Sequence, residues 1–134
     1  MARVFLVIAG LMWVVYGAYL LAMPQALAPL AGVTATSVTG TIELRAMYGG
    51  LEIAVGLFAL IAAFVPGMLF SGLLMMGLAS AGFGITRLLS AAFVGEFSTY
   101  TRQGLSLELP LMLISAWFLY RQRSLRPGSR AAGT

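Results

Sequence analysis

The sequence predicts an all-α protein, an integral membrane bundle of four transmembrane helices. Hydrophobic residues make up 60% of the chain and charged residues 9%, and the mean hydropathy is +0.97. Soluble globular domains carry about 25% charged residues, so this composition indicates a membrane protein. The apolar runs are also long enough to cross a hydrocarbon layer of about 30 Å. We expect one membrane domain over residues 1–123 and a disordered cytoplasmic tail over residues 124–134.

The first two helices are expected over residues of about 4–23 and 42–65. The first run contains no charged residue and is followed by Pro24. The second run is followed by Pro66-Gly67, a dipeptide typical of tight turns. Both runs therefore have the length of a transmembrane helix and a sequence signal that ends it.

The first run also resembles a secretory signal, because Arg3 precedes it and the small residues Ala26-Leu27-Ala28 follow it. It is longer than the apolar part of an ordinary signal and contains Trp13, Tyr16 and Tyr19. We therefore expect this segment to be retained as the first helix.

The third and fourth helices are expected over residues of about 68–93 and 105–120. A polar stretch, residues 95–103, separates them. The fourth run contains Glu108 and Pro110, which both weaken it as a membrane-spanning helix. The fourth span is nevertheless needed to bring the two ends of the chain to one side of the membrane.

Arginine placement predicts the orientation. Arg3 precedes the first run, the loop over residues 24–41 has no charge, and four arginines follow the last run: Arg121, Arg123, Arg126 and Arg130. By the positive-inside rule, both termini are cytoplasmic in a multi-pass protein of the bacterial cytoplasmic (inner) membrane. These flanking arginines account for the net charge of +4, so we expect no nucleic-acid partner.

The residue inventory limits the chemistry of the chain. All eight cationic residues are Arg and all four acidic residues are Glu, and His and Cys are absent. Zinc, haem, iron–sulfur and thiol sites depend mainly on His and Cys. Two carboxylates could bind another metal, but arginines beside them argue against it. We assign no metal, no cofactor and no catalytic residue.

Charged residues inside the apolar runs define the candidate binding site. A charge in hydrocarbon costs at least ~2.5 kcal/mol, so such residues usually pair or work. Counting ~1.5 Å per residue from the Pro66-Gly67 turn places two arginines at one depth and a glutamate ~10 Å deeper. We expect Arg87 to form a buried salt bridge shared between Glu52 and Glu108, with Arg45 and Tyr48 nearby.

Small residues recur at helical spacing in all four runs. Such stripes let membrane helices approach closely. We expect the four stripes to face one interior; they contain Gly10 and Gly17, then Gly49 and Gly56, then Gly77, Ser80 and Gly84, then Gly104 and Ser115.

The segment from Glu43 to Glu52 reads ELRAMYGGLE and is followed by Gly56. It resembles the signature of a bacterial membrane family known as domain of unknown function 4345. The resemblance extends over nearly the whole chain and implies four apolar segments, with an Arg late in the third. It implies no activity.

The function expected from these features is binding, by the protein alone or as an accessory subunit. An outward-facing pocket with arginines suits an anionic or carbonyl-bearing amphiphile, such as a lipid headgroup or a quinone. The expected partners are the lipid bilayer, such an amphiphile, and a second copy or another membrane protein.

Three alternatives stay open. The charged residues could serve only to join the helices. A membrane-embedded enzyme could use Glu52 or Glu108 in carboxylate acid–base chemistry. A dimer could act as a proton-coupled transporter.

Overall fold

The structure, a computed structural model, describes residues 1–124 and is helical over most of that range. No strand occurs within it. The helices are, in order, α1 (Ala2–Ala22), a 3₁₀ turn (Pro24–Ala26), α2 (Leu27–Ala31), α3 (Val38–Leu44), the π-helical segment η2 (Arg45–Gly50), α4 (Leu51–Phe64), α5 (Leu69–Val94) and α6 (Thr99–Ser124).

Three helices are long and apolar enough to cross a membrane. They are α1, the continuous 27-residue helix Val38–Phe64 that α3, η2 and α4 form together, and α5. The fourth predicted span lies within α6, which has 26 residues but is not in this set. Besides Glu108 and Pro110, α6 contains Arg102, Arg121 and Arg123, which lower its apolar character.

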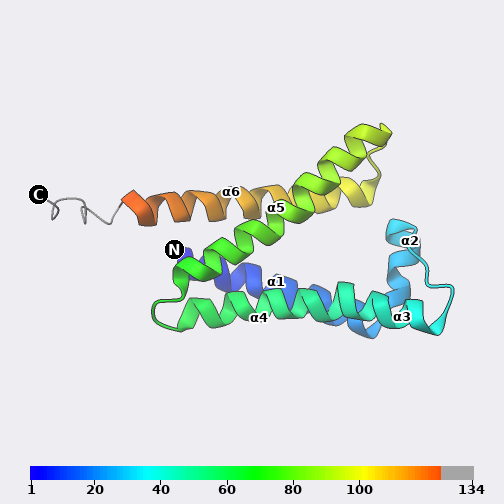
Figure 1. Ribbon diagram of the computed structural model, residues 1–134, viewed down its shortest axis with the longest axis horizontal. Coiled ribbons are helices and arrows are strands. Elements are labelled where there is room, and N and C mark those ends of the chain that lie inside the picture. The colour runs from blue at the N-terminus through cyan, green and yellow to red at the C-terminus, as the bar shows by residue number, and fades with distance from the viewer. Residues whose placement is uncertain (125–134) are drawn as a thin grey trace, which may run out of the picture.

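The long helices run antiparallel and form two pairs (Figure 1). α1 packs along α4, and α5 packs along α6, while α5 crosses α4 obliquely. The expectation that the small residues of four stripes face one interior is therefore wrong, because Gly10 and Gly17 contact the α3–α4 helix while Gly77 and Gly84 contact α6. The N-terminus, the turn between α4 and α5, and the C-terminal end of α6 lie at one end of the molecule.

The α1–α4 pair is in backbone contact at its glycines. A Cβ atom added to Gly10 would lie 2.8 Å from the carbonyl oxygen of Gly56, and one added to Gly17 would lie 2.8 Å from the carbonyl oxygen of Gly49. No larger residue fits at these crossings without moving a backbone. The close approach predicted from small residues is confirmed for this pair.

A compact core lies where α1, α4 and α5 meet. It consists of small and medium side chains: Leu6, Ala9, Ala59, Ala62, Ala63, Leu73 and Met76. Its alanines let α5 lie close against α4, and the ring of Phe5 packs on that of Phe118 of α6, 5.8 Å between centroids. The core thus joins the two helix pairs at the end of the molecule that carries the N-terminus.

Two expected loops are shorter than predicted because serines cap the helices that follow them. Ser37 Oγ accepts a hydrogen bond from the Gly40 N–H at 3.0 Å, so α3 begins at Val38. Ser98 Oγ accepts one from the Thr101 N–H at 3.1 Å, so α6 begins at Thr99. A serine whose oxygen satisfies a free N–H is a favoured start of a helix.

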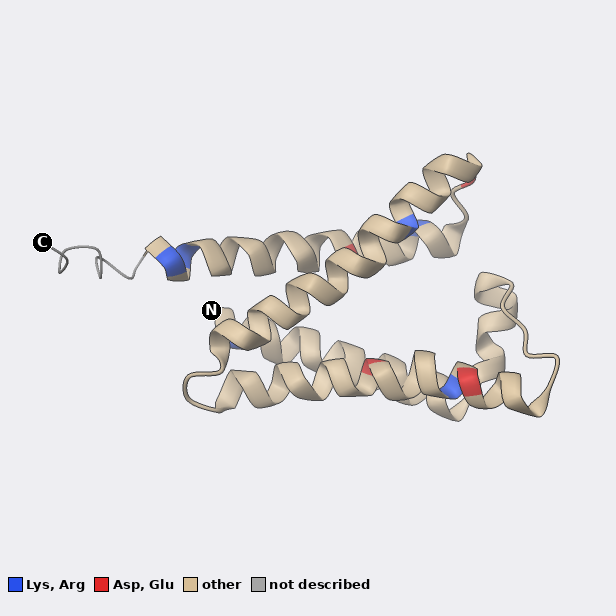
Figure 2. Ribbon diagram, viewed as in Figure 1, with Lys and Arg blue, Asp and Glu red and all other residues tan. Residues whose placement is uncertain are grey.

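The predicted tail, residues 124–134, lies outside the described residues except for Ser124, which ends α6. Arg126 and Arg130 also lie outside the described part of the chain. Basic residues are nevertheless visible at the C-terminal end of α6, at the same end of the molecule as the N-terminus (Figure 2).

Candidate functional site

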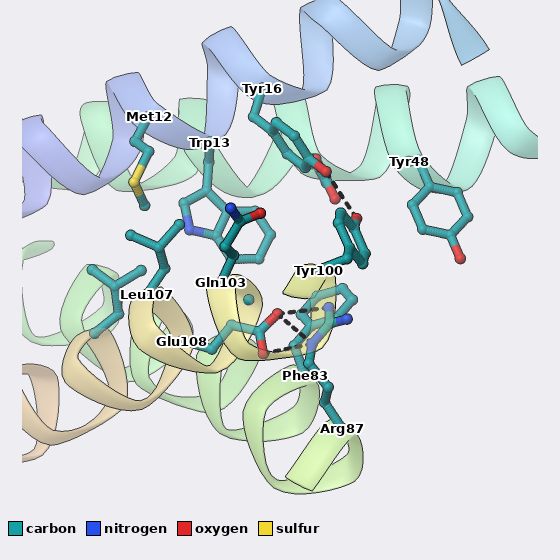
Figure 3. A pocket seen from close by; sticks show the side chains of 13 residues that line it. Met12, Trp13, Tyr16, Tyr48, Phe83, Arg87, Tyr100, Gln103, Leu107 and Glu108 are labelled. Carbon is teal, nitrogen blue, oxygen red and sulfur yellow. Dashed lines mark hydrogen bonds and ion pairs between the residues drawn. The ribbon is translucent and has the colours of Figure 1, made fainter. Parts of the chain in front are cut away.

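A cavity of about 250 Å³ lies between the two helix pairs, with residues of α1, η2, α4, α5 and α6 in its wall. It is in the half of the molecule away from the N-terminus, beyond the core. One part of its wall is aromatic and aliphatic and is formed by Met12, Trp13, Phe83, Leu107 and Leu111 (Figure 3). The Trp13 and Phe83 rings pack on each other, with centroids 5.6 Å apart, and link α1 to α5.

Arg87 and Glu108 form a forked ion pair at the edge of this cavity. Arg87 Nε donates to Glu108 Oε2 at 3.0 Å, and Arg87 Nη2 donates to Glu108 Oε1 at 2.8 Å. The guanidinium lies against Gly104, where an added Cβ would be 2.8 Å from Arg87 Nε. A glycine at this position therefore leaves the room that the arginine side chain occupies.

The prediction of a buried salt bridge is wrong for this pair. The Arg87 side chain is 26% exposed and that of Glu108 is 12% exposed. The α1–α4 pair does not cover the C-terminal end of α5 and the N-terminal end of α6 on one side (Figure 1). The arginine side chain is therefore accessible from the surface of the molecule. An exposed guanidinium keeps part of its hydration, which lowers the cost of holding it there.

Glu52 is the most deeply buried ionisable side chain in the described part of the chain. It lies in the first turn of α4, is 7% exposed and lines the cavity. Its Oε2 atom has no hydrogen-bond partner among the described residues. The expected sharing of Arg87 between two glutamates is not seen, because the carboxylate that Arg87 contacts is that of Glu108. A buried polar atom without a partner costs free energy unless something else satisfies it.

Two tyrosines connect the helix pairs across the mouth of the cavity. The hydroxyl groups of Tyr16 on α1 and Tyr100 on α6 are 2.9 Å apart and share a hydrogen bond (Figure 3). The Arg87 guanidinium carbon also lies 5.6 Å from the centre of the Tyr100 ring. Tyr100 therefore contacts both the ion pair and the opposite helix pair.

Sequence reasoning did not select either tyrosine as a site residue. Helical spacing could have indicated Tyr16, because it follows Trp13 by three residues and precedes Gly17 by one. Its partner, 84 positions away, could not be inferred from spacing within one helix. Phe83 and Gln103, which also line the cavity, gave no signal beyond their position near Arg87 and Glu108.

Four of the five predicted site residues line the cavity: Tyr48, Glu52, Arg87 and Glu108. Arg45 is exposed and is not among the lining residues. The prediction assumed regular α-helical spacing between Arg45 and Glu52, but residues 45–50 are π-helical. A π-helical turn contains more residues than an α-helical turn, so Arg45 is rotated away from the face that carries Glu52.

The described residues do not form a typical cluster of metal ligands. No group of three or more His, Cys, Asp or Glu side chains gathers within that part of the chain. The polar groups that reach the cavity are carboxylates, phenols, one amide and one guanidinium. Such groups can form hydrogen bonds, pair with a charge and transfer protons.

The sequence from residue 1 to residue 119 matches the protein family described as Domain of unknown function (DUF4345). The chain therefore belongs to this family, and the resemblance based on the segment from Glu43 to Glu52 is confirmed. The π-helical segment η2, Arg45–Gly50, lies within this signature segment. No curated protein and no solved structure matches the chain.

Proposed function

We propose that this chain is a multi-pass membrane protein whose cavity binds a small amphiphile or a lipid headgroup, by itself or as an accessory subunit. The observation that carries the proposal is the Glu52 carboxyl group, which is buried in the cavity wall with an oxygen that has no partner among residues 1–124. In a protein interior, such a group is usually satisfied by water, by an ion or by a ligand.

Membrane insertion is supported by the apolar side chains on the outside of the long helices. Large hydrophobic residues that lie more than half exposed would be covered by lipid, and examples are Val4, Ile8, Leu78, Leu89 and Phe93. A soluble monomer rarely exposes contiguous apolar surface on this scale. In this arrangement α6 is the fourth span, and three of its polar residues, Tyr100, Gln103 and Glu108, line the cavity.

The orientation proposed here places both termini in the cytoplasm of a bacterial cell and opens the cavity outward. Fusing alkaline phosphatase within residues 95–98 should give high enzyme activity, because this turn would lie outside the cytoplasm. Fusing it after Arg130 should give none. The reverse pattern would show that the arrangement is inverted.

Size and wall composition also support ligand binding. Ligand sites in proteins are mostly apolar, contain a few polar groups that orient the ligand, and have volumes of about 300–1,000 Å³. The cavity of about 250 Å³ lies just below this range. It therefore suits a headgroup or a short amphiphile rather than a whole phospholipid.

Mass spectrometry of the molecules that co-purify with the protein tests the binding proposal. Leu107 lines the cavity, so Leu107→Trp should fill part of it and remove the co-purifying molecule. Leu113 is on the same helix but is not among the residues that line the cavity. Leu113→Trp should therefore retain that molecule. If no molecule is enriched over the bulk lipid extract, or if both variants retain it equally, the binding proposal fails.

A second function, carboxylate acid–base catalysis, is favoured by one specific observation. Glu52 and Glu108 both line the cavity, but Arg87 pairs only one of them, so the two carboxyl groups are in different environments. Such a difference is what separates an acid from a base in enzymes. If the purified protein converts the co-purified molecule and Glu52→Gln does not, the protein is an enzyme.

If the protein carries a proton flux into proteoliposomes and Glu52→Gln does not, the protein is a transporter.

A further inference from the structure

We infer that the ligand of this cavity is cationic, an alkylammonium compound whose nitrogen pairs with Glu52. The inference rests on the proposed binding function and specifies its substrate class. It departs from the anionic or carbonyl-bearing ligand that the arginines in the sequence suggest. Three features of the cavity carry it: its charge, the unsatisfied oxygen of Glu52, and its aromatic wall.

The acidic and basic side chains in the cavity wall are unequal in number. There are two glutamates, Glu52 and Glu108, and one arginine, Arg87. Arg87 is paired with Glu108 through its Nε and Nη2 atoms. Arg45, which would have balanced the count, is exposed and outside the cavity. An anionic headgroup would lie in the same small cavity as Glu52 and beside an arginine whose charge Glu108 already balances.

Glu52 has the position that an ammonium group requires. A carboxylate only accepts hydrogen bonds, and the buried Oε2 atom accepts none from the described residues. An ammonium nitrogen would supply both the missing donor and the opposite charge. Charge-assisted hydrogen bonds of this kind are roughly twice as strong as neutral ones.

Aromatic rings form much of the surface around this carboxylate. Trp13, Tyr16 and Phe83 line the cavity together with Glu52. Figure 3 shows their side chains between α1, the C-terminal half of α5 and the N-terminal half of α6. Ring faces attract cations, and the attraction grows where water is excluded. The cavity already displays this preference, since the Arg87 guanidinium lies over the Tyr100 ring.

The ammonium group could belong to a free alkylamine or to the ethanolamine headgroup of a phospholipid. Both present a primary ammonium group, which in the headgroup is joined to the phosphate through an ethylene link. A cavity of about 250 Å³ suits a small group of this kind. The experiment therefore needs one arm that identifies the chemistry and another that identifies the source.

Trp13 provides a fluorescent probe within the cavity wall. The chain contains two tryptophans, and the other, Trp117, lies elsewhere on α6 beside Arg121. In a Trp117→Phe background, the purified full-length protein in detergent would be titrated with octylammonium, octanol and octanoate. We expect octylammonium to change the Trp13 fluorescence saturably, with at least tenfold tighter binding than octanoate.

Matched glutamate variants test the role of the carboxylate. Glu52→Gln should weaken octylammonium binding at least tenfold and leave octanol binding unchanged. Glu43 lies nine residues before Glu52 on the same continuous helix, is exposed, and is outside the cavity. Glu43→Gln should therefore bind octylammonium as the parent does. If Glu52→Gln does not fold, the preference of the parent for octylammonium over octanoate decides the question.

The failure of this inference differs from the failure of the proposed function. Binding of octanol and octanoate without preference for octylammonium would overturn the cationic ligand while leaving an amphiphile site. No saturable response to any of the three would overturn the amphiphile site itself. In the source arm, vesicles with phosphatidylethanolamine should compete with octylammonium if the occupant is a lipid headgroup, whereas phosphatidylglycerol vesicles should not. Equal affinity in both vesicles would assign the site to a free amine.

Discussion

The two helix pairs use small residues at similar spacing for different purposes. In the α1–α4 pair, glycine faces glycine: Gly10 is beside Gly56, and Gly17 is beside Gly49. Where α5 and α6 meet, the glycines face side chains: Gly77 is beside Ser115, Gly84 is beside Glu108, and Gly104 is beside Arg87. The first pair is joined through backbones, and the second leaves room for polar groups between the helices.

This difference explains where the cavity lies and which pair supplies its charges. Helices in backbone contact leave no space between them, so Glu52 projects from the α1–α4 pair toward the other pair. Helices separated by side chains can hold an ion pair such as Arg87–Glu108. The α1–α4 pair thus forms one wall of the cavity, to which it contributes Glu52, and the α5–α6 pair supplies the Arg87–Glu108 ion pair.

The largest effect is expected from Gly56→Ala in the α1–α4 pair. A Cβ at this position would lie 2.6 Å from the Gly10 carbonyl oxygen and 2.8 Å from the Val14 backbone nitrogen. Backbone atoms on both sides cannot yield without separating the helices, so the cost should reach the upper end of the ~1–3 kcal/mol range for overpacking. Thermal unfolding of the purified protein in detergent measures it.

Gly82→Ala is the matched control for that substitution. Gly82 is also inside a long helix, α5, but an added Cβ would have nothing within 4 Å. This variant should gain up to ~1 kcal/mol, because alanine favours a helix over glycine. Equal effects of the two substitutions would show that α1 and α4 are not in backbone contact.

An intermediate effect is expected from breaking the ion pair in the α5–α6 pair. Arg87→Ala leaves Glu108 without its charged partner and should cost about 2 kcal/mol, within the range for an unsatisfied buried group and below that for a fully buried charge. Arg45→Ala should change stability by less than ~0.5 kcal/mol, as is usual for an exposed residue. Thermal unfolding in detergent compares the two variants.

A double-mutant cycle identifies the partner of Arg87. Adding Glu108→Gln to Arg87→Ala should recover about half of the loss, since both members of the pair are then uncharged. Adding Glu52→Gln should recover much less, because Arg87 forms its ion pair with Glu108. Greater recovery with Glu52→Gln would mean that Arg87 pairs with Glu52 instead.

The sequence predicted much of the fold because the signals for it are local. Long apolar runs, Pro24 and the Pro66-Gly67 turn indicated α1, α4 and α5, and small residues at helical spacing indicated the contact faces. It did not predict that the contact faces pair two by two. That choice depends on which residues meet between helices, such as Gly56 beside Gly10, and spacing within one run carries no information about it.

The site was predicted less completely, for reasons that also concern geometry. Tyr48, Glu52, Arg87 and Glu108 were selected because polar residues are rare in apolar runs, and they line one cavity. Arg45 was placed by regular helical spacing, which the π-helical segment η2 breaks. Tyr16 was overlooked because a tyrosine in an apolar helix usually needs no explanation beyond packing or the membrane interface.

The smallest effect is expected from the hydrogen bond between Tyr16 and Tyr100, which joins the two helix pairs at the mouth of the cavity. Tyr16→Phe should lower stability by about 0.5–1 kcal/mol, the net worth of a typical hydrogen bond. Tyr100→Phe should have a similar effect, and the double variant should lose no more than either single variant, because all three lack the same bond. The bond also restrains the helix pairs from separating at this end. Both single variants should therefore speed hydrogen–deuterium exchange more in the N-terminal half of α6 than in the C-terminal half of α1. Glycine contacts hold this part of α1 against η2. Additive losses of stability, or faster exchange in α1 than in α6, would show that the tyrosines act separately and that the α1–α4 pair is not the rigid member.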